Sequence, residues 1–349
     1  MRLGLNMGYW GAGNDADNLA LAQEADALGY DSCWVAEAYG SDAPTVLSWV
    51  AAQTKQINVG SAIFQIPART PASCAMTAAT LDALSGGRFR LGLGVSGPQV
   101  SEGWYGAKFD KPLARTREYS DIVKLALRRE RVSYQGQHYV LPLPDGPGKA
   151  LQLTVHPVRE HIPMYLAAVG PKNLELAGEL FDGWLGIFFS PEFGKEQLAS
   201  VEAGRAKVGK TLEGFDVAPS MPLVLGDDVR ACADQIRWYA ALYVGGMGSR
   251  DKNFYNQLAC RMGYEKEAAE VQDLYLAKKY DEAAAAVPHE FIERTTLLGT
   301  KEQVAERMKE LAAAGVTTLI LTPAAPTLDE RKAALRTAVE ALELAGVGS

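Results

Sequence analysis

The sequence predicts an α/β fold, a (β/α)8 barrel in which eight parallel strands alternate with helices. Three observations support this prediction. A short apolar strand recurs eight times, a helix follows most of these strands, and glycine often ends the helix before the next strand. The length of 349 residues also suits one such barrel with insertions. We therefore expect a single domain over residues 1–349, with insertions at about 130–162 and 239–296.

The predicted strands are short runs rich in apolar and β-branched residues, as is typical of strands buried on both faces. They cover residues 3–7, 32–36, 57–63, 89–95, 164–168, 184–189, 217–225 and 317–321. Residues 57–97 hold one complete strand–helix–strand unit. In this unit Thr70 can cap a helix that begins at Pro71, and Gly86 and Gly87 suit its left-handed end.

Other helices carry local start and stop signals. Leu19, Ala22 and Leu28 keep the spacing of one helical face, and Gly29 can end that helix. Near the C-terminus two pairs have the spacing of a capping box, Thr300 with Gln303 and Thr327 with Glu330. The second pair would begin a closing helix over residues 329–345.

Two stretches interrupt the repeat. Residues 130–162 contain RVSYQGQHYVLPLP and PDGPG, which predict a β-hairpin and a proline-rich loop. Residues 239–296 begin with glycine-rich and aromatic sequence, YVGGMGSRDKNFYN (243–256), and continue as helix. Because long ordered insertions on barrels often act as lids or subunit contacts, we expect one of these roles here. We also expect a homodimer or a higher homo-oligomer.

The composition argues against several classes of function. The formal net charge of −7 argues against a nucleic-acid surface. No run of about 18 apolar residues predicts a membrane span, and the N-terminus lacks the apolar region of a signal peptide. The four cysteines form no CxxC and the four histidines form no HxH or HExxH, so we expect a cytoplasmic protein without a metal site. The expected partner is a small-molecule substrate.

In a barrel, the loops that follow the strands build the active site. Here these loops are glycine-rich and aromatic, and Glu37 and Asp42 are notable among their few acid–base groups. Such a site suits a cofactor that carries its own chemistry. We expect five aromatic residues to line a substrate pocket, although each alone is more often a packing residue: Tyr9, Trp10, Tyr39, Phe64 and Trp104.

Two glycine-rich loops follow predicted strands. Residues 92–97 match GxGxxG, but Pro98 and polar residues follow, and not the helix of a dinucleotide fold. Alternatively, Gly92 and Gly94 thin a barrel strand so that another group can lie against it. After the fifth strand, residues 167–173 (AAVGPKN) lead into a helix. This second loop is either an anion site or an ordinary turn with a solvated Lys172.

Several motifs together resemble the luciferase-like flavin family, and more closely its branch that uses the deazaflavin coenzyme F420. They are LGLNMGYWG (3–11), GSAIFQIPARTPA (60–72), SGGRFRLGLGVSG (85–97) and GPKNLELAG with DGWLGIFFSPE (170–192). The resemblance spans nearly the whole chain. It implies a (β/α)8 barrel, in agreement with the strand pattern.

The resemblance also implies where the cofactor lies. In relatives a non-proline cis peptide at the end of the third strand backs the cofactor ring, and it matches Ala62–Ile63 here, next to Ser61. The fourth-strand loop that faces the cofactor maps to Ser96, Gly97 and Gln99. The phosphate contact maps to Val169, Gly170, Pro171, Lys172 and Asn173, which favours the anion site. On this interpretation Gly92 and Gly94 make room for a flat deazaflavin ring.

One departure concerns the end of the second strand. Several relatives carry an Asp–His pair there, whereas this sequence has Glu37 and Ala38. The histidine acid–base group is therefore absent, and we expect Glu37 to bond the cofactor or to relay a proton.

The resemblance implies an F420-dependent oxidoreductase that transfers a hydride between the deazaflavin and a small organic substrate. Two alternatives remain open. One is an FMN-dependent monooxygenase of the same superfamily, and the other is a flavin-binding barrel without catalysis.

Overall fold

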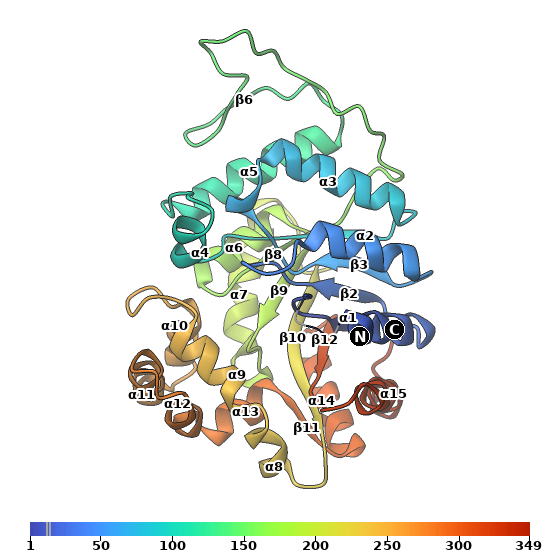
Figure 1. The fold of residues 1–349 in the computed structure, drawn as a ribbon, viewed down its shortest axis with the longest axis vertical. Helices are drawn as coiled ribbons and strands as arrows, with labels where there is room; N and C mark the ends of the chain where they lie inside the picture. The colour runs from blue at the N-terminus through green and yellow to red at the C-terminus, as the bar shows by residue number, and fades with distance from the viewer. Residues whose placement is uncertain (12, 14) are drawn as a thin grey trace.

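Eight parallel strands close into a barrel in the computed structural model, which describes every residue except 12 and 14 (Figure 1). In order around the barrel they are β1 (Arg2–Asn6), β2 (Ser32–Val35), β3 (Asn58–Ser61), β5 (Phe89–Gly94), β8 (Met164–Ala167), β9 (Gly183–Ile187), β10 (Asp216–Leu225) and β12 (Thr318–Pro323). The first and last strands pair in register, with Leu3 opposite Leu319. The predicted (β/α)8 barrel is therefore confirmed.

Two short strands were not predicted. Residues 57–63 were expected to form one strand, but β3 ends at Ser61, and β4 (Phe64–Gln65) continues beside β5. The Ala62–Ile63 peptide bond between β3 and β4 is cis, at the predicted position. The other short strand, β11 (Leu297–Gly299), extends the sheet beside the end of β10.

Helices form the outer layer around the strands. They are α1 (Asp15–Ala27), α2 (Ala43–Gln53), α3 (Pro71–Leu84), α5 (Pro112–Leu127), α6 (Pro171–Leu180), α7 (Pro191–Lys207), α14 (Lys301–Ala313) and α15 (Leu328–Ala345). The predicted caps are confirmed: Thr70 accepts from the Ser73 N–H, and capping boxes begin α14 and α15. Gly29 and Gly86 have φ values of +77° and +68°, as their helix ends require.

The first insertion is the predicted hairpin, β6 (Tyr134–Gln135) with β7 (Val140–Leu141), and it stands away from the barrel at the top of Figure 1. The second insertion is helical. It comprises α9 (Arg237–Ala241), a π-helical turn η2 (Leu242–Gly246), α10 (Phe254–Arg261), α11 (Glu265–Leu276), α12 (Tyr280–Ala286) and α13 (His289–Thr295). A short helix, α8 (Val229–Asp234), precedes it.

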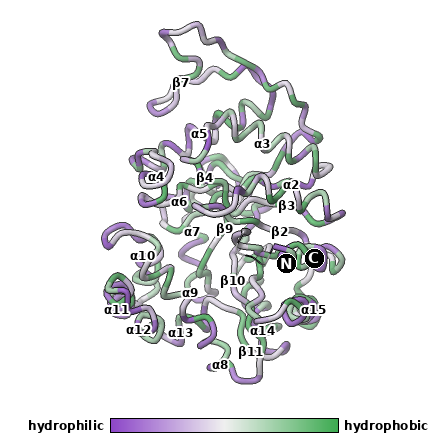
Figure 2. Tube along the Cα trace, in the orientation of Figure 1, coloured by the Kyte–Doolittle hydropathy of each residue, from purple (hydrophilic) through white to green (hydrophobic). Residues whose placement is uncertain are grey.

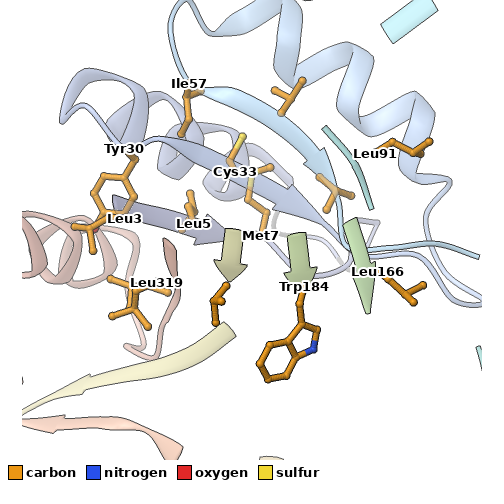
Figure 3. Packing of buried hydrophobic residues seen from close by; sticks show 14 of the residues in the cluster. Leu3, Leu5, Met7, Tyr30, Cys33, Ile57, Leu91, Leu166, Trp184 and Leu319 are labelled. Carbon is orange, nitrogen blue, oxygen red and sulfur yellow. The ribbon is translucent and has the colours of Figure 1, made fainter. Parts of the chain in front are cut away.

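Three apolar clusters hold these layers together. The largest lies between the strands and the outer helices, and Figure 3 shows part of it, including Leu5, Cys33 and Leu166. A second cluster lies between the helical insertion and the barrel, where it includes Phe188, Val224 and Leu298. Figure 2 shows hydrophilic segments on the peripheral helices α11 and α12. The helical insertion is thus packed onto the barrel by a core of its own.

The third cluster fills the inside of the barrel. It contains Trp34, Tyr165, Leu185, Ala218 and Ile320, and the rings of Trp34 and Tyr165 meet edge to face at 5.1 Å. Over the part of the chain that the structure describes, no helix is long and apolar enough to cross a membrane.

Candidate functional site

The predicted site residues come from loops at one end of the barrel. Because the strands are parallel, their C-terminal ends meet at one rim. Tyr9 follows β1, Glu37 follows β2, and the cis bond at Ala62 follows β3. Ser96 follows β5, and Gly170 follows β8. The fold therefore brings these segments to a common mouth, as expected from the sequence.

An apolar surface forms one half of the floor of this mouth. Ala62, Ile63 and Ala167 are partly buried and pack on the cluster inside the barrel. Ala167 shares the inward face of β8 with Tyr165, because side chains of a strand alternate between its faces. These apolar side chains form a platform next to the Trp34 and Tyr165 rings.

Polar side chains from three neighbouring strands form the other half of the floor. Asn6 Nδ2 donates to Thr322 Oγ1 at 3.0 Å and to Ser220 Oγ at 3.3 Å. The Gly8 N–H donates to Asn6 Oδ1 at 3.0 Å, which fixes the amide orientation. The three polar side chains are partly buried. The sequence analysis missed this group because Asn6 lies more than 200 residues from each of its two partners and meets them only when the barrel closes.

The glycines of β5 correct one prediction. A Cβ on Gly92 would lie 1.9 Å from the Ser61 carbonyl oxygen, and a Cβ on Gly94 would lie 2.2 Å from Ile63 Cδ1. The buried Ser61 hydroxyl also donates to the Gly92 carbonyl at 2.8 Å. The group that lies against these glycines is thus the end of β3 and the residues that follow it. Gly92 and Gly94 give no room to a coenzyme ring.

The loop after β5 differs from the expected coil. Residues from Pro98 to Gly103 form a short helix, α4 (Pro98–Gly103), which follows Gly97. Ser96 has a φ of +63°, and Gln99 Oε1 lies 3.6 Å from an ideal Cβ on Gly97. Because the preceding glycines belong to a barrel strand, the dinucleotide interpretation of GxGxxG is wrong.

Glu37 is held by an arginine that the sequence analysis missed. Both Arg69 terminal nitrogens donate to the Glu37 carboxylate at 2.8 Å. The Gln65 and Ala43 N–H groups donate to the same carboxylate at 3.2 and 3.3 Å. Arg69 also covers the Phe64 ring, 4.6 Å from its centroid. Each carboxylate oxygen therefore has two donors, and this geometry does not support Glu37 as a proton relay.

The loop after β8 has the features of an anion site. The helix α6 begins at Pro171, and its N-cap Gly170 provides no side-chain cap. Lys172 is exposed in the first turn, and Asn173 Oδ1 is buried without a hydrogen-bond partner among the described residues. The free amides and positive dipole of a helix N-terminus favour anions.

A second cation reaches this loop from the helical insertion. Arg261, at the end of α10, donates from Nη2 to the Val169 carbonyl at 3.1 Å. Burial lowers the pKa of Arg261, although Glu196 opposes this shift. The sequence analysis missed Arg261 because it lies 92 residues from Val169 and reaches the loop only through the fold.

The five predicted pocket residues separate into two groups. Tyr9, Tyr39 and Trp104 are 46%, 68% and 65% exposed at the rim. Trp10 and Phe64 are 8% and 0% exposed and belong to the main core. These two rings therefore pack in the interior and do not line an open pocket.

The helical insertion adds an aromatic group that was not predicted. Tyr239, Tyr243 and Tyr255 surround Phe188, and we call them the tyrosine cluster. The Phe188 ring centroid lies 5.8, 5.7 and 6.5 Å from those of Tyr239, Tyr243 and Tyr255, respectively. All three tyrosines are partly buried. The aromatic composition of residues 243–256 was the available signal, but no local rule assigns such residues to a barrel mouth.

A separate hollow of about 380 Å³ lies beside Arg69, between the chain after β4 and α5. Its lining includes Ile66, Ser101, Arg115 and Tyr139. It is distinct from the tyrosine cluster, and of the predicted site residues none is in its lining.

Known proteins resemble this chain in sequence and in fold. The family model for luciferase-like monooxygenases matches residues 7–318. A protein of Mycobacterium tuberculosis whose name assigns it provisionally to the coenzyme F420-dependent oxidoreductases is 45% identical, over 92% of this chain and 95% of that protein. A 5,10-methylenetetrahydromethanopterin reductase of Archaeoglobus fulgidus is 28% identical, over 85% of this chain and 86% of that enzyme.

Solved structures share the same barrel. The coenzyme F420-dependent tetrahydromethanopterin reductase of Methanopyrus kandleri superposes with a TM-score of 0.82 at 23% identity, over 97% of each chain. An F420-dependent secondary alcohol dehydrogenase, solved with an F420–acetone adduct, gives 0.79 at 19% identity, over 98% of each chain.

Proposed function

Because the chain belongs to the luciferase-like monooxygenase family, we propose that it is an F420-dependent oxidoreductase. In this proposal it transfers a hydride between the deazaflavin coenzyme and a small organic substrate. The name of the Mycobacterium tuberculosis relative supports the choice of coenzyme, because it assigns that protein to the coenzyme F420-dependent oxidoreductases.

The observation that carries the proposal is the two-sided floor of the mouth. A deazaflavin has a flat ring system with one apolar and one polar edge. Ala62, Ile63 and Ala167 offer an apolar platform to the first, and Thr322 and Ser220 offer hydroxyl groups to the second. The residues present therefore fit this coenzyme.

The loop after β8 supports the same assignment. The coenzyme carries a phosphate, and Lys172, Arg261 and the start of α6 supply positive charge at one side of the mouth. Asn173 Oδ1 has no donor among the described residues, and it suits a hydroxyl of the chain that joins ring and phosphate.

The scarcity of free acid–base groups at the rim also supports a coenzyme that carries the chemistry. Glu37 is occupied by Arg69, and the exposed Tyr9, Tyr39 and Trp104 stand around it at the rim. When bound, the coenzyme supplies or accepts the hydride, and the protein orients the partners and excludes water.

FMN-dependent oxygenation is the second candidate, because the same floor and anion loop would accept FMN. Anaerobic turnover distinguishes the two. We expect the protein to oxidise reduced F420 when an enone such as cyclohexenone is added without oxygen. Oxygen-dependent turnover with reduced FMN alone would favour the FMN-dependent monooxygenase over the F420-dependent oxidoreductase. Binding of F420 without turnover of enones, imines or alcohols would favour a non-catalytic barrel.

We also propose a homo-oligomer and a cytoplasmic location. Light scattering of the purified protein checks the first. Fractionation of cells that express a tagged chain checks the second.

A further inference from the structure

We propose that the tyrosine cluster is the substrate side of the site, and that Tyr243 protonates the oxygen of an uncharged carbonyl substrate. This inference rests on the proposed function, because the reduced deazaflavin coenzyme supplies the hydride that the same carbonyl carbon receives.

The position of the cluster supports this role. Phe188 directly follows β9, so the cluster is anchored at the rim where the strands end. The rings of Tyr243 and Tyr239 lie 4.8 Å apart, and those of Tyr243 and Tyr255 lie 4.9 Å apart. Tyr9, from the loop after β1, is close enough to raise the pKa values of Tyr239 and Tyr255. The tyrosines of the insertion therefore lie near the mouth from which Tyr9 projects.

The backbone that carries Tyr243 is fixed by buried contacts. Tyr243 lies in the π-helical turn η2, and such turns are frequent at functional sites. Asn253, which is 1% exposed, donates to the Tyr243 carbonyl at 3.0 Å and accepts from the Tyr255 N–H at 3.0 Å. One buried side chain thus sets the positions of two members of the cluster.

Two glycines let a neighbouring helix support this turn. A Cβ on Gly245 would lie 2.5 Å from Tyr275 Cβ, and one on Gly246 would lie 2.2 Å from Tyr275 Cε1. Only glycine permits this close approach of α11 to the turn. Such support from a second layer is typical of residues that must hold a precise orientation.

Tyr243 is the central member of the cluster. Its ring centroid lies 4.8 Å from that of Tyr239 and 4.9 Å from that of Tyr255. A tyrosine hydroxyl can both donate and accept, so Tyr243 can donate to a substrate while it accepts from a neighbour. Burial raises the pKa of Tyr239 and Tyr243, so both hydroxyl groups carry their protons near neutral pH.

The surroundings favour a substrate without charge. Burial and neighbouring tyrosines are the main influences on the pKa values of Tyr9, Tyr239, Tyr243 and Tyr255. An ionic substrate would be desolvated among these rings at a high cost. A cyclic or aromatic ketone or enone could pack against the four rings.

The proposed step balances in atoms and electrons. The carbonyl carbon gains a hydride from the reduced coenzyme, the C=O π bond breaks, and the oxygen takes the Tyr243 proton. The Tyr243 oxygen regains a proton from Tyr239, which is resupplied by solvent. In the reverse direction the alcohol proton passes to the Tyr243 oxygen as its carbon loses the hydride.

The test compares three variants, Tyr243→Phe, Tyr239→Phe and the matched control Tyr264→Phe. Tyr264 lies in the same insertion and packs on Phe291 at 5.5 Å, but its hydroxyl accepts from Arg294 instead. Turnover of cyclohexanone, in which the carbonyl is the one reducible group, with reduced F420 and the affinity for F420 are measured for each. We expect Tyr243→Phe to lower kcat about 100-fold, Tyr239→Phe to lower it less, and Tyr264→Phe to leave it unchanged. F420 affinity should be equal in all three.

A second measurement tests the subsite without coenzyme. Saturation-transfer NMR reports binding of cyclohexanone to the apoprotein, and we expect saturable binding that Tyr243→Phe weakens and Tyr264→Phe does not. Equal kcat for Tyr243→Phe and Tyr264→Phe, or no saturable binding to the wild type, would overturn the inference. Failure of the proposed function is separate, because it appears as absence of F420 binding by the wild type.

Discussion

The Glu37 carboxylate and the Arg69 guanidinium form a two-point ion pair beneath the rim of the barrel, with two N–O distances of 2.8 Å. The side chains are only 5% and 12% exposed. The pair joins the loop after β2 to the chain after β4, and thereby supports two sides of the mouth.

Substitution of Glu37 should therefore affect stability more than proton transfer. In Glu37→Gln the Arg69 charge loses its buried partner and keeps only the exposed Asp42, at 3.7 Å, so we expect the free energy of unfolding to fall by about 3 kcal/mol. Glu130→Gln is the control, since its pair with Arg128 is about half exposed and worth under about 1 kcal/mol. Urea unfolding measures both. Unchanged stability together with a shifted pH profile of kcat would instead restore the proton-relay role.

The close contact between β3 and β5 predicts a steric effect. Gly92→Ala places a Cβ 1.9 Å from the Ser61 carbonyl oxygen, which is backbone and cannot rotate away. We expect a loss of about 3 kcal/mol or more in thermal or urea unfolding. Gly103→Ala, where a Cβ meets nothing within 4 Å, should stay within about 0.5 kcal/mol of the wild type. A stable Gly92→Ala protein would mean that the strands are farther apart than described.

The anion loop predicts a change in coenzyme affinity. Lys172→Ala and Arg261→Ala should each raise the Kd for F420 about tenfold, because each removes a cation near the phosphate. The effect should shrink as salt is added, since exposed charges are screened. Lys207→Ala is the control, because Lys207 pairs with Glu175 and lies outside the loop. If all three variants bind F420 alike, the phosphate binds elsewhere.

Asp26 should account for part of the loss of folding stability at low pH. Burial opposes its ionisation, but the N–H groups of Ile57, Lys55 and Gln56 outweigh this and lower its pKa below 3.8. The stabilisation is therefore present above about pH 3.8 and is lost as pH falls through the lower folded-state value. Asp26→Asn should reduce stability at neutral pH and flatten its decline in acid.

The measurement for Asp26 is urea unfolding as a function of pH. The exposed Asp251, changed to Asn, serves as the control. A decline in acid that is equally steep in Asp26→Asn and in the wild type would contradict the assignment.

Much of the fold follows from signals that are local in sequence. Thr70 with Pro71 begins α3, and Thr300 with Gln303 begins α14, because each cap depends on residues within one helical turn. The recurrence of eight short apolar strands, most of them followed by a helix, also suffices to predict the barrel. The position of the cis bond followed from resemblance and not from such signals.

The parts of the site that were missed are held by contacts between distant residues. Glu37 meets Arg69 across 32 residues, and Asn6 meets Thr322 across 316. For the same reason Gly92 was assigned to coenzyme contact, although its close neighbour is Ser61. The tyrosine cluster depends on how an insertion folds back onto the barrel, which no spacing rule in the sequence encodes.

The choice of coenzyme is tested most directly by equilibrium titration of the protein with F420 and with FMN. Quenching of the fluorescence of its six tryptophans reports binding. We predict saturable binding of F420, with a Kd at least about tenfold lower than that for FMN. Ala167→Phe, which would fill the apolar floor, should remain folded and lose most of this affinity. Tight binding of FMN with no binding of F420 would contradict the account.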